Sequence, residues 1–124
     1  MEGFAAIETL LGFYAADVVC YPAPGWVDYP ICHGHEGMRD LGARWLELVD
    51  HPNVNVHEVR DLRHRLLVLA EFTGRAKDTG TPVSVHFGVV NSDLRDDGKV
   101  GEARFFLSWD EARSAAGLAT SSVA

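Results

Sequence analysis

Positive charge is scarce in this sequence. Lysine and arginine together number 11 against 18 aspartates and glutamates, so the formal net charge is −7 at pH 7. Proteins that bind nucleic acids or anionic membranes use clusters of Lys and Arg to displace counterions or to meet lipid headgroups. The charge balance therefore argues against a nucleic acid and against a membrane as partner.

Long apolar runs and cysteines are also scarce. No run approaches the roughly 20 apolar residues of a membrane span, and the start MEGFAAIETLL lacks the basic residues of a signal peptide. Cys20 and Cys32 form no CxxC pair, and no GxSxG, P-loop or GxGxxG motif occurs. These absences predict a reduced, cytoplasmic protein that uses no cofactor.

The residues that are present suit one globular domain spanning 1–124. Hydrophobic residues make up 47% of the 124 and charged residues 23%, which is a typical globular mixture and enough for a core. The most regular part is the C-terminal half, where three runs rich in Val, Leu and Phe alternate with polar turns. Asp97-Gly98 is a strong hairpin signal, and short turns require antiparallel pairing. We predict strands over 66–73, 83–94 and 100–107 as consecutive antiparallel neighbours.

The N-terminal half mixes helices with short strands. Phe4, Ile7, Leu11 and Tyr14 recur at spacings of three and four, which predicts a helix over 5–15. The same reasoning predicts a strand over 17–21, followed by a loop to Gly34. A helix over 35–48 comes next; residues 50–53 end it, and a strand follows near 54–58. A terminal helix over 112–116 has Asp110 as its predicted N-cap. Helices on one side of a mostly antiparallel sheet define an α+β fold.

Three stretches carry a family resemblance. ETLLGFYAADVVCY, CHGHEGMRDLGARWLEL and TPVSVHFGVVNSDLRDDGKVGEARFFLSWDEA resemble segments of the SnoaL-like, nuclear transport factor 2-like superfamily. The resemblance implies a cone in which a curved antiparallel sheet wraps helices and leaves a pocket at its open end. Members usually begin with a longer helix that has no counterpart here, so we expect either a wider, more solvent-open pocket or a neighbouring chain in the place of that helix.

The same superfamily includes polyketide cyclases, ketosteroid isomerase, limonene epoxide hydrolase and scytalone dehydratase, together with binding proteins that catalyse nothing. The residues matching their catalytic positions are not the catalytic types: Cys20, Pro22, Gly42, Val90 and Phe105. The resemblance therefore implies a fold and a pocket, and does not transfer those activities.

Strand 83–94 presents two opposed faces. Val83, Val85, Phe87 and Val89 share one face, and Ser84, His86 and Gly88 share the other. Periodicity alone buries the odd face and leaves His86 outside. The resemblance instead implies that the even face lines the pocket and that a second subunit covers the apolar odd face, which predicts a homodimer.

If the even face lines the pocket, His86 is the candidate general base. Glu71 interrupts an apolar strand, for which a solvated strand edge is the simpler interpretation. If Glu71 shares the pocket face with His86, the two residues are neighbours across the strand pair, and the carboxylate would orient the imidazole. The chemistry would then be proton abstraction beside a carbonyl. A one-residue change of register would separate the two residues.

Other candidates belong to the rim and lining of the pocket. Trp26, Asp28 and Tyr29 lie in the aromatic loop, Ser84 is a possible hydrogen-bond donor to a ligand, and Phe105 lies in the last strand. His33 and His35 form an HxH pair without a third ligand nearby in sequence, so we expect no metal.

Three kinds of function fit these observations. The first is a cofactor-independent cyclase, isomerase or dehydratase acting on a hydrophobic carbonyl compound. The second is a protein that binds a small hydrophobic molecule without chemistry. The third is a structural dimer module whose cone is filled by Trp26, Phe105 and Trp45.

Overall fold

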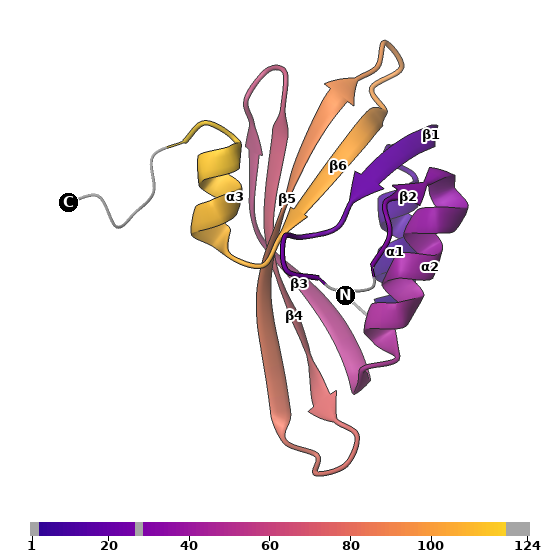
Figure 1. The fold of residues 1–124 in the computed structure, drawn as a ribbon, viewed down its shortest axis with the longest axis vertical. Helices are drawn as coiled ribbons and strands as arrows, with labels where there is room; N and C mark the ends of the chain where they lie inside the picture. Colours follow the sequence, from indigo (N-terminus) through magenta and orange to yellow (C-terminus); the bar gives the residue numbers. More distant parts are fainter. Residues whose placement is uncertain (1–2, 27–28, 119–124) are drawn as a thin grey trace, which may run out of the picture.

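A curved six-stranded sheet organises the protein (Figure 1). The computed structural model describes residues 3–26 and 29–118. The strands lie in the order β2-β1-β6-β5-β4-β3, and all neighbours are antiparallel except β1 and β6. Their bounds are β1 Tyr14–Tyr21, β2 Cys32–His33, β3 Val49–Asp61, β4 Leu66–Ala76, β5 Pro82–Leu94 and β6 Val100–Phe106. This is the predicted α+β architecture with a curved, unclosed sheet.

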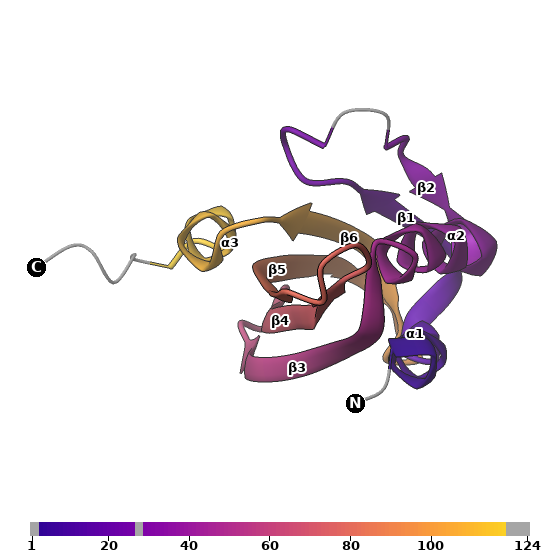
Figure 2. The same cartoon turned by 90° about the horizontal axis from the view of Figure 1, so that it is seen from below.

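Helices cover both faces of this sheet. α1 Gly3–Leu11 and α2 Gly34–Leu46 lie on its concave side, while α3 Trp109–Ala115 lies on the opposite, convex side (Figures 1 and 2). Two buried clusters match these positions: Tyr14, Val18 and Val89 pack with Met38 of α2, whereas Leu67, Leu69 and Val90 pack with Ala112 and Ala116. The expectation that helices gather on one side is therefore correct for α1 and α2 and wrong for α3.

The predicted meander is confirmed. β4 pairs with β5 from Leu66↔Asn91 to Arg75↔Pro82, and β5 pairs with β6 from Gly88↔Phe106 to Leu94↔Val100. Both turns contain a glycine at positive φ, 72° at Gly80 and 83° at Gly98. The turn chemistry that the sequence displays is the chemistry that these reversals need.

Several element boundaries differ from prediction. α1 ends at Leu11 because Tyr14 already belongs to β1, where it pairs with Val100 of β6. β3 continues through 50–53 with a register shift instead of breaking there. Ser108, not Asp110, caps α3, since its side chain accepts from the backbone N–H of Glu111. The short strand β2 was not predicted.

The odd face of β5 is the concave, buried face. Val83, Val85 and Phe87 pack against a buried cluster of Leu46, Val49 and Phe72, and the Phe87 ring contacts that of Trp45 on α2. Periodicity therefore predicted this strand correctly, and the expectation that its even face lines the pocket is wrong. Since helices of the same chain cover the odd row, that row gives no reason for a second subunit, and the homodimer stays a prediction.

Neither a membrane span nor a metal cluster is found in the described part of the chain. None of its helices has the length and apolar character needed to cross a bilayer. Among residues 3–26 and 29–118, no three His, Cys, Asp or Glu side chains are arranged to hold a metal ion.

Candidate functional site

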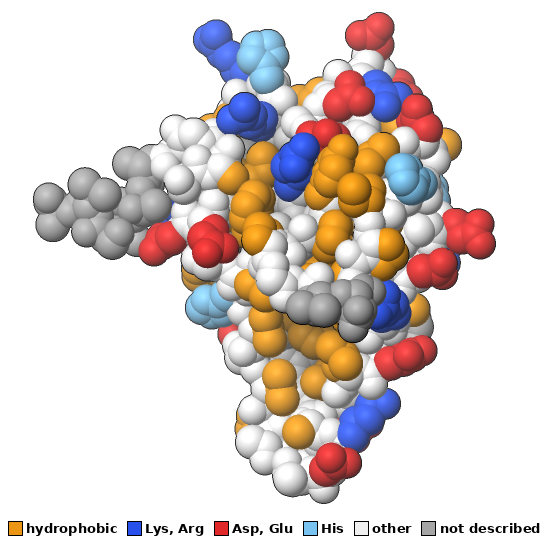
Figure 3. Space-filling model, viewed as in Figure 1, with side chains coloured by type: hydrophobic (Ala, Val, Ile, Leu, Met, Phe, Trp, Pro, Cys, Tyr) orange, Lys and Arg blue, Asp and Glu red, His pale blue; other side chains and the backbone are white. Residues whose placement is uncertain are grey.

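An apolar cavity of about 110 Å³ lies between the concave face and the two helices above it. Five aromatic side chains line it together with aliphatic residues of α1, α2 and β3: Trp26, Trp45, Phe72, Phe87, Phe105, Ile7, Leu10, Leu11, Met38, Leu41, Gly42, Leu46 and Val54. No ionisable side chain belongs to this lining of described residues. On the face shown in Figure 3, hydrophobic side chains gather along the middle and most charged ones lie around the edge.

Ring contacts fix the walls of this cavity. The centroid of Trp45 lies 5.2 Å from that of Phe72 and 5.6 Å from that of Phe87, both in edge-to-face geometry. Trp26 lies 5.0 Å from Trp45 and 5.9 Å from Phe105. Such pairs hold rings in defined orientations. Trp26, Trp45 and Phe105 therefore form part of the wall of this cavity.

Gly42 brings the two helices together above the cavity. A Cβ atom at this position would lie 2.5 Å from Cδ1 of Ile7 on α1. The glycine that stands where the resemblance has a catalytic tyrosine thus serves close helix packing.

A second and larger hollow, of about 510 Å³, adjoins the first. The two linings share Leu10 and Val54, so the hollows lie side by side on the concave face. Its wall is mostly apolar, and it includes Phe13, Val56, Val59, Leu66 and Val68.

Two buried polar side chains belong to this second hollow. Tyr14 Oη donates to Asn91 Oδ1 at 2.5 Å, and Asn91 Nδ2 donates to the backbone oxygen of Leu66 at 3.1 Å. Asn91 is only 2% exposed and Tyr14 only 7%. Burial raises the pKa of Tyr14 well above its usual range, so its hydroxyl stays protonated at neutral pH.

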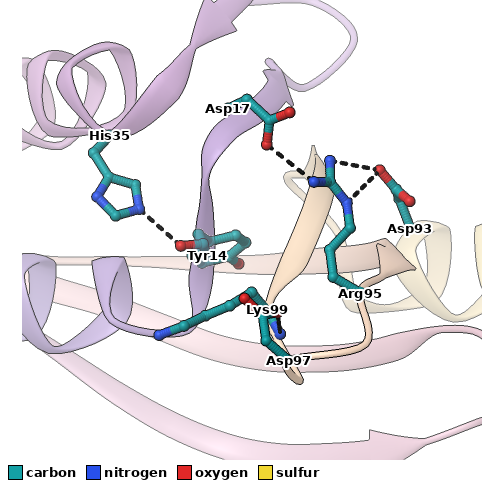
Figure 4. Close-up of polar contacts among 7 residues, drawn as sticks. All are labelled: Tyr14, Asp17, His35, Asp93, Arg95, Asp97 and Lys99. Carbon is teal, nitrogen blue, oxygen red and sulfur yellow. Dashed lines mark hydrogen bonds and ion pairs between the residues drawn. The ribbon is translucent and has the colours of Figure 1, made fainter.

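Polar contacts on either side of β1 hold Tyr14 in place (Figure 4). His35 Nε2 donates to the backbone oxygen of Tyr14 at 2.7 Å. Arg95 bridges Asp17 of β1, at 3.1 Å, and Asp93 of β5, at 2.9 Å. These contacts tie the start of β1 to α2 and to the end of β5, and so fix the position of the tyrosine.

The predicted pair Glu71 and His86 lies on the convex face. The two residues are cross-strand partners, and His86 Nε2 lies 3.9 Å from Glu71 Oε2. Ser84 Oγ donates to the same carboxylate at 2.5 Å, and His57, the extra residue of a bulge in β3, lies 3.6 Å from Glu71 Oε1. The pairing is therefore as predicted, but the cavity is on the other side of the sheet.

The His86 ring lies on Trp109 instead of in the pocket. The two rings stack with centroids 4.0 Å apart and an interplanar angle of 6°. Trp109 Nε1 donates to the backbone oxygens of Ala70 and Phe87, which fixes the indole on the sheet. Strand alternation is the physical reason: Phe87 points at Trp45, so its neighbour His86 must point away. Placing His86, Glu71 and Ser84 in the pocket was wrong.

Glu71 is nevertheless a perturbed carboxylate. The hydrogen bond from Ser84, followed by the neighbouring His57 and His86, lowers the pKa of Glu71 below its usual value. A carboxylate held in its charged form and paired with two half-exposed imidazoles suits a surface network.

The remaining predicted residues divide into two groups. Trp26 and Phe105 line the cavity. Tyr29 is not part of the lining but contacts Trp26, with ring centroids 5.3 Å apart, and the Arg44 guanidinium lies over the Tyr29 ring, 4.1 Å from its centroid. Asp28 lies outside the described residues.

The two cysteines are buried thiols beside the cavity. Cys20 and Cys32 face each other across β1 and β2 and pack with Leu41. Burial, together with Cys32, raises the pKa of Cys20 to about 12. A thiol with that pKa is protonated at neutral pH and is a poor nucleophile.

Sequence reasoning missed Tyr14 and Asn91. Asn91 follows Val83, Val85, Phe87 and Val89 on the odd face of β5. A polar residue in a row that is otherwise apolar and buried needs hydrogen-bond partners, and this could have marked Asn91 as a site residue. The resemblance pointed to Val90, one residue away, which the structure places under α3. Tyr14 was counted as part of the first helix.

Comparisons with known proteins give the fold. No family model matches the sequence, and no curated protein matches it. Solved structures do match. TerC co-crystallized with polyporic acid has a TM-score of 0.68 and 21% identity over 86% of this chain and 83% of its own.

Two further matches are with bacterial proteins. A hypothetical protein with a ketosteroid isomerase-like fold from Catenulispora acidiphila, in complex with trimethylamine, has a TM-score of 0.64 and 16% identity, covering 90% and 82% of the two chains. A candidate SnoaL-like polyketide cyclase from Jannaschia sp. CCS1 has a TM-score of 0.63 and 19% identity, covering 81% and 70%. The chain therefore has the SnoaL-like, nuclear transport factor 2-like fold.

Proposed function

We propose that this protein binds a small hydrophobic molecule in the concave cavity. The observation that carries the proposal is the lining itself, which is aromatic and aliphatic throughout. Apolar cavities of roughly 150 Å³ take up ligands of the size of benzene without a polar contact. The cavity of about 110 Å³ is smaller than that, but the hollow of about 510 Å³ beside it shares Leu10 and Val54, and the two together have room for a two-ring molecule. Two of the structural neighbours were solved with small molecules, polyporic acid in TerC and trimethylamine in the Catenulispora protein.

Binding without catalysis is the form of this function that the geometry favours. A cyclase or isomerase must place an acid or a base within hydrogen-bond reach of its substrate. His86 lies across the sheet, and the described lining of the first cavity offers no titratable group. Enzymes among the structural neighbours, such as the epoxide hydrolase/cyclase-like SalBIII, keep a cyclase activity as the second candidate.

The expected affinity is modest. Ligands of about ten heavy atoms gain on the order of 0.5 kcal/mol per atom, which corresponds to a dissociation constant on the order of 100 μM. Equilibrium dialysis with naphthalene as probe measures this range. We expect saturable binding with one site per chain.

Leu10 supplies the variant that tests the location of the site. It is 41% exposed and lines both hollows, so Leu10→Trp places an indole in their shared wall. We expect naphthalene to bind at least about tenfold more weakly, a loss of roughly 1.4 kcal/mol. Leu107→Trp is the matched control, because Leu107 is 40% exposed and lies in neither lining. Absence of saturable binding to the unmodified protein, or equal loss in both variants, would contradict the proposal.

A further inference from the structure

The second hollow contains a polar pair that an apolar ligand would leave unused. Asn91 is the one buried polar residue among the described residues, and it contacts Tyr14 in a wall whose other polar residues are Thr9 and Asn55. Buried polar groups cost free energy unless their hydrogen-bonding capacity is met. The pair therefore indicates what kind of molecule this end of the concave face suits.

Asn91 and Tyr14 do not use all their hydrogen-bond donors and acceptors on each other and on the described residues around them. The Asn91 amide carries two N–H donors, and in the described residues Nδ2 makes one bond, to the backbone oxygen of Leu66. That bond also fixes the amide orientation, since a backbone oxygen can only accept. Tyr14 Oη uses its hydrogen for Asn91 Oδ1 and keeps lone pairs that can accept. One N–H donor and one oxygen acceptor thus remain, on two contacting residues of the same hollow.

The charge of the surroundings restricts the ligand further. The described lining of the second hollow contains no Lys, Arg or His side chain, and the chain carries a net charge of −7. A carboxylate or phosphate would lose its hydration here without gaining a counter-charge. A neutral oxygen, by contrast, matches one donor and one acceptor.

We propose that the second hollow holds a neutral hydroxyl or carbonyl group of the ligand, whose apolar body occupies the adjoining cavity. A ligand carbonyl accepts from Asn91 Nδ2–H. A ligand hydroxyl accepts from the same N–H and donates to Tyr14 Oη. The preferred class is therefore a small cyclic or aromatic alcohol, phenol or ketone. This inference rests on the proposed function, because it assigns an orientation to a molecule bound in the cavity.

The test compares two probes that differ by a single hydroxyl group, naphthalene and 2-naphthol. Their affinities are measured by equilibrium dialysis for the unmodified protein and for the double variant Tyr14→Phe/Asn91→Leu. Replacing both hydrogen-bonded partners with apolar groups of similar shape costs less stability than removing one of them. Ser92→Ala is the control: it removes a neighbouring hydroxyl on β5 that bonds to Glu102 and lies in neither lining.

We expect the double variant to bind 2-naphthol roughly five- to tenfold more weakly, the value of one or two hydrogen bonds, and to bind naphthalene within about twofold of the unmodified protein. Equal affinities of variant and unmodified protein for 2-naphthol would overturn the inference and leave the proposed function intact. Failure of the unmodified protein to bind either probe would overturn both. If the double variant does not fold, Tyr14→Phe alone replaces it. Because this variant keeps the Asn91 N–H donor, the expected loss is that of one hydrogen bond, roughly two- to fivefold, and is confined to 2-naphthol.

Discussion

The two faces of the sheet differ in how completely their side chains are packed and hydrogen-bonded. On the convex face, α3 covers the middle strands closely and the polar residues beside it satisfy one another: Ser84, Glu71, His57 and His86 form one network against Trp109. On the concave face, two helices stand over a wall of rings and aliphatic side chains and leave hollows of about 110 and 510 Å³. The network on the convex face is explained by the contacts within it, whereas the unfilled apolar space on the concave face is explained by a ligand, as proposed above.

The titratable residues do not lie on the face that is proposed to bind a ligand. His86 and Glu71 lie on the convex face, outside both linings, whereas the cavity is lined by residues that look like ordinary core. Burial and unfilled volume identify the site better than residue chemistry does.

The largest difference in stability between the two faces should come from truncating a leucine on each of them. Leu69 is 1% exposed and packs under α3, so Leu69→Ala should lower the free energy of unfolding by about 2–5 kcal/mol. Leu10→Ala, in the wall of the cavities, should cost less than about 1 kcal/mol, because Leu10 is already 41% exposed. Chemical denaturation of both variants measures the difference, and similar losses would mean that the concave wall is as tightly packed as the convex one.

Gly88 tests how closely α3 sits on the sheet. A Cβ atom at Gly88 would approach the Cβ of Ala112 to within an impossible distance, so Gly88→Ala should destabilise the protein by roughly 1–3 kcal/mol. Ala112→Gly alone should cost about 1 kcal/mol through helix propensity.

The double variant Gly88→Ala/Ala112→Gly is the control for that contact. Because the second change restores space for the first, the two losses should sum to more than the loss of the double variant, with a coupling of roughly 1 kcal/mol. Strict additivity would show that α3 does not rest on Gly88.

The smallest effect concerns the pH dependence of the convex network. The pKa of folded Glu71 lies below its usual value, so its contribution to stability is present above that usual value and is lost as pH falls through the folded one. Between pH 7 and pH 3, the free energy of unfolding should therefore fall more steeply below roughly pH 4 in the unmodified protein than in Glu71→Gln.

Two further variants sharpen this result. Ser84→Ala should make the fall of the unfolding free energy with decreasing pH less steep, because the Ser84 hydrogen bond is the largest cause of the lowered pKa of Glu71. Glu111→Gln, a change at an exposed carboxylate of α3, is the control and should keep the slope of the unmodified protein. An identical slope for Glu71→Gln would contradict the network.

Much of the fold was predictable because its signals are local. The turns at Gly80 and Gly98 and the alternation in β5 lie within a few residues of the features that they determine. The site was less predictable, because Tyr14 and Asn91 are 77 residues apart and meet only through the parallel pairing of β1 with β6. No short-range pattern reports such a pairing.

The misplaced His86 has a separate cause. The alternation of β5 placed it outside, and the family resemblance overrode that evidence by matching Val90, which shares the face of His86, to a pocket position. A shift of one residue along a strand exchanges its two faces, so an alignment that is wrong by one residue inverts the site. Periodicity read from this chain was the better guide.

The central claim is that the concave cavity holds a small hydrophobic molecule, and Met38 allows the most direct test. Met38 lines the cavity, and the sequence contains only one other methionine, Met1. With methyl-labelled methionine, NMR titration with naphthalene should shift the Met38 methyl signal saturably, since a ring beside it changes its magnetic environment, and Leu10→Trp should weaken the titration by at least about tenfold. Met38→Leu assigns the signal. A Met38 resonance that stays in place at saturating naphthalene would contradict the account.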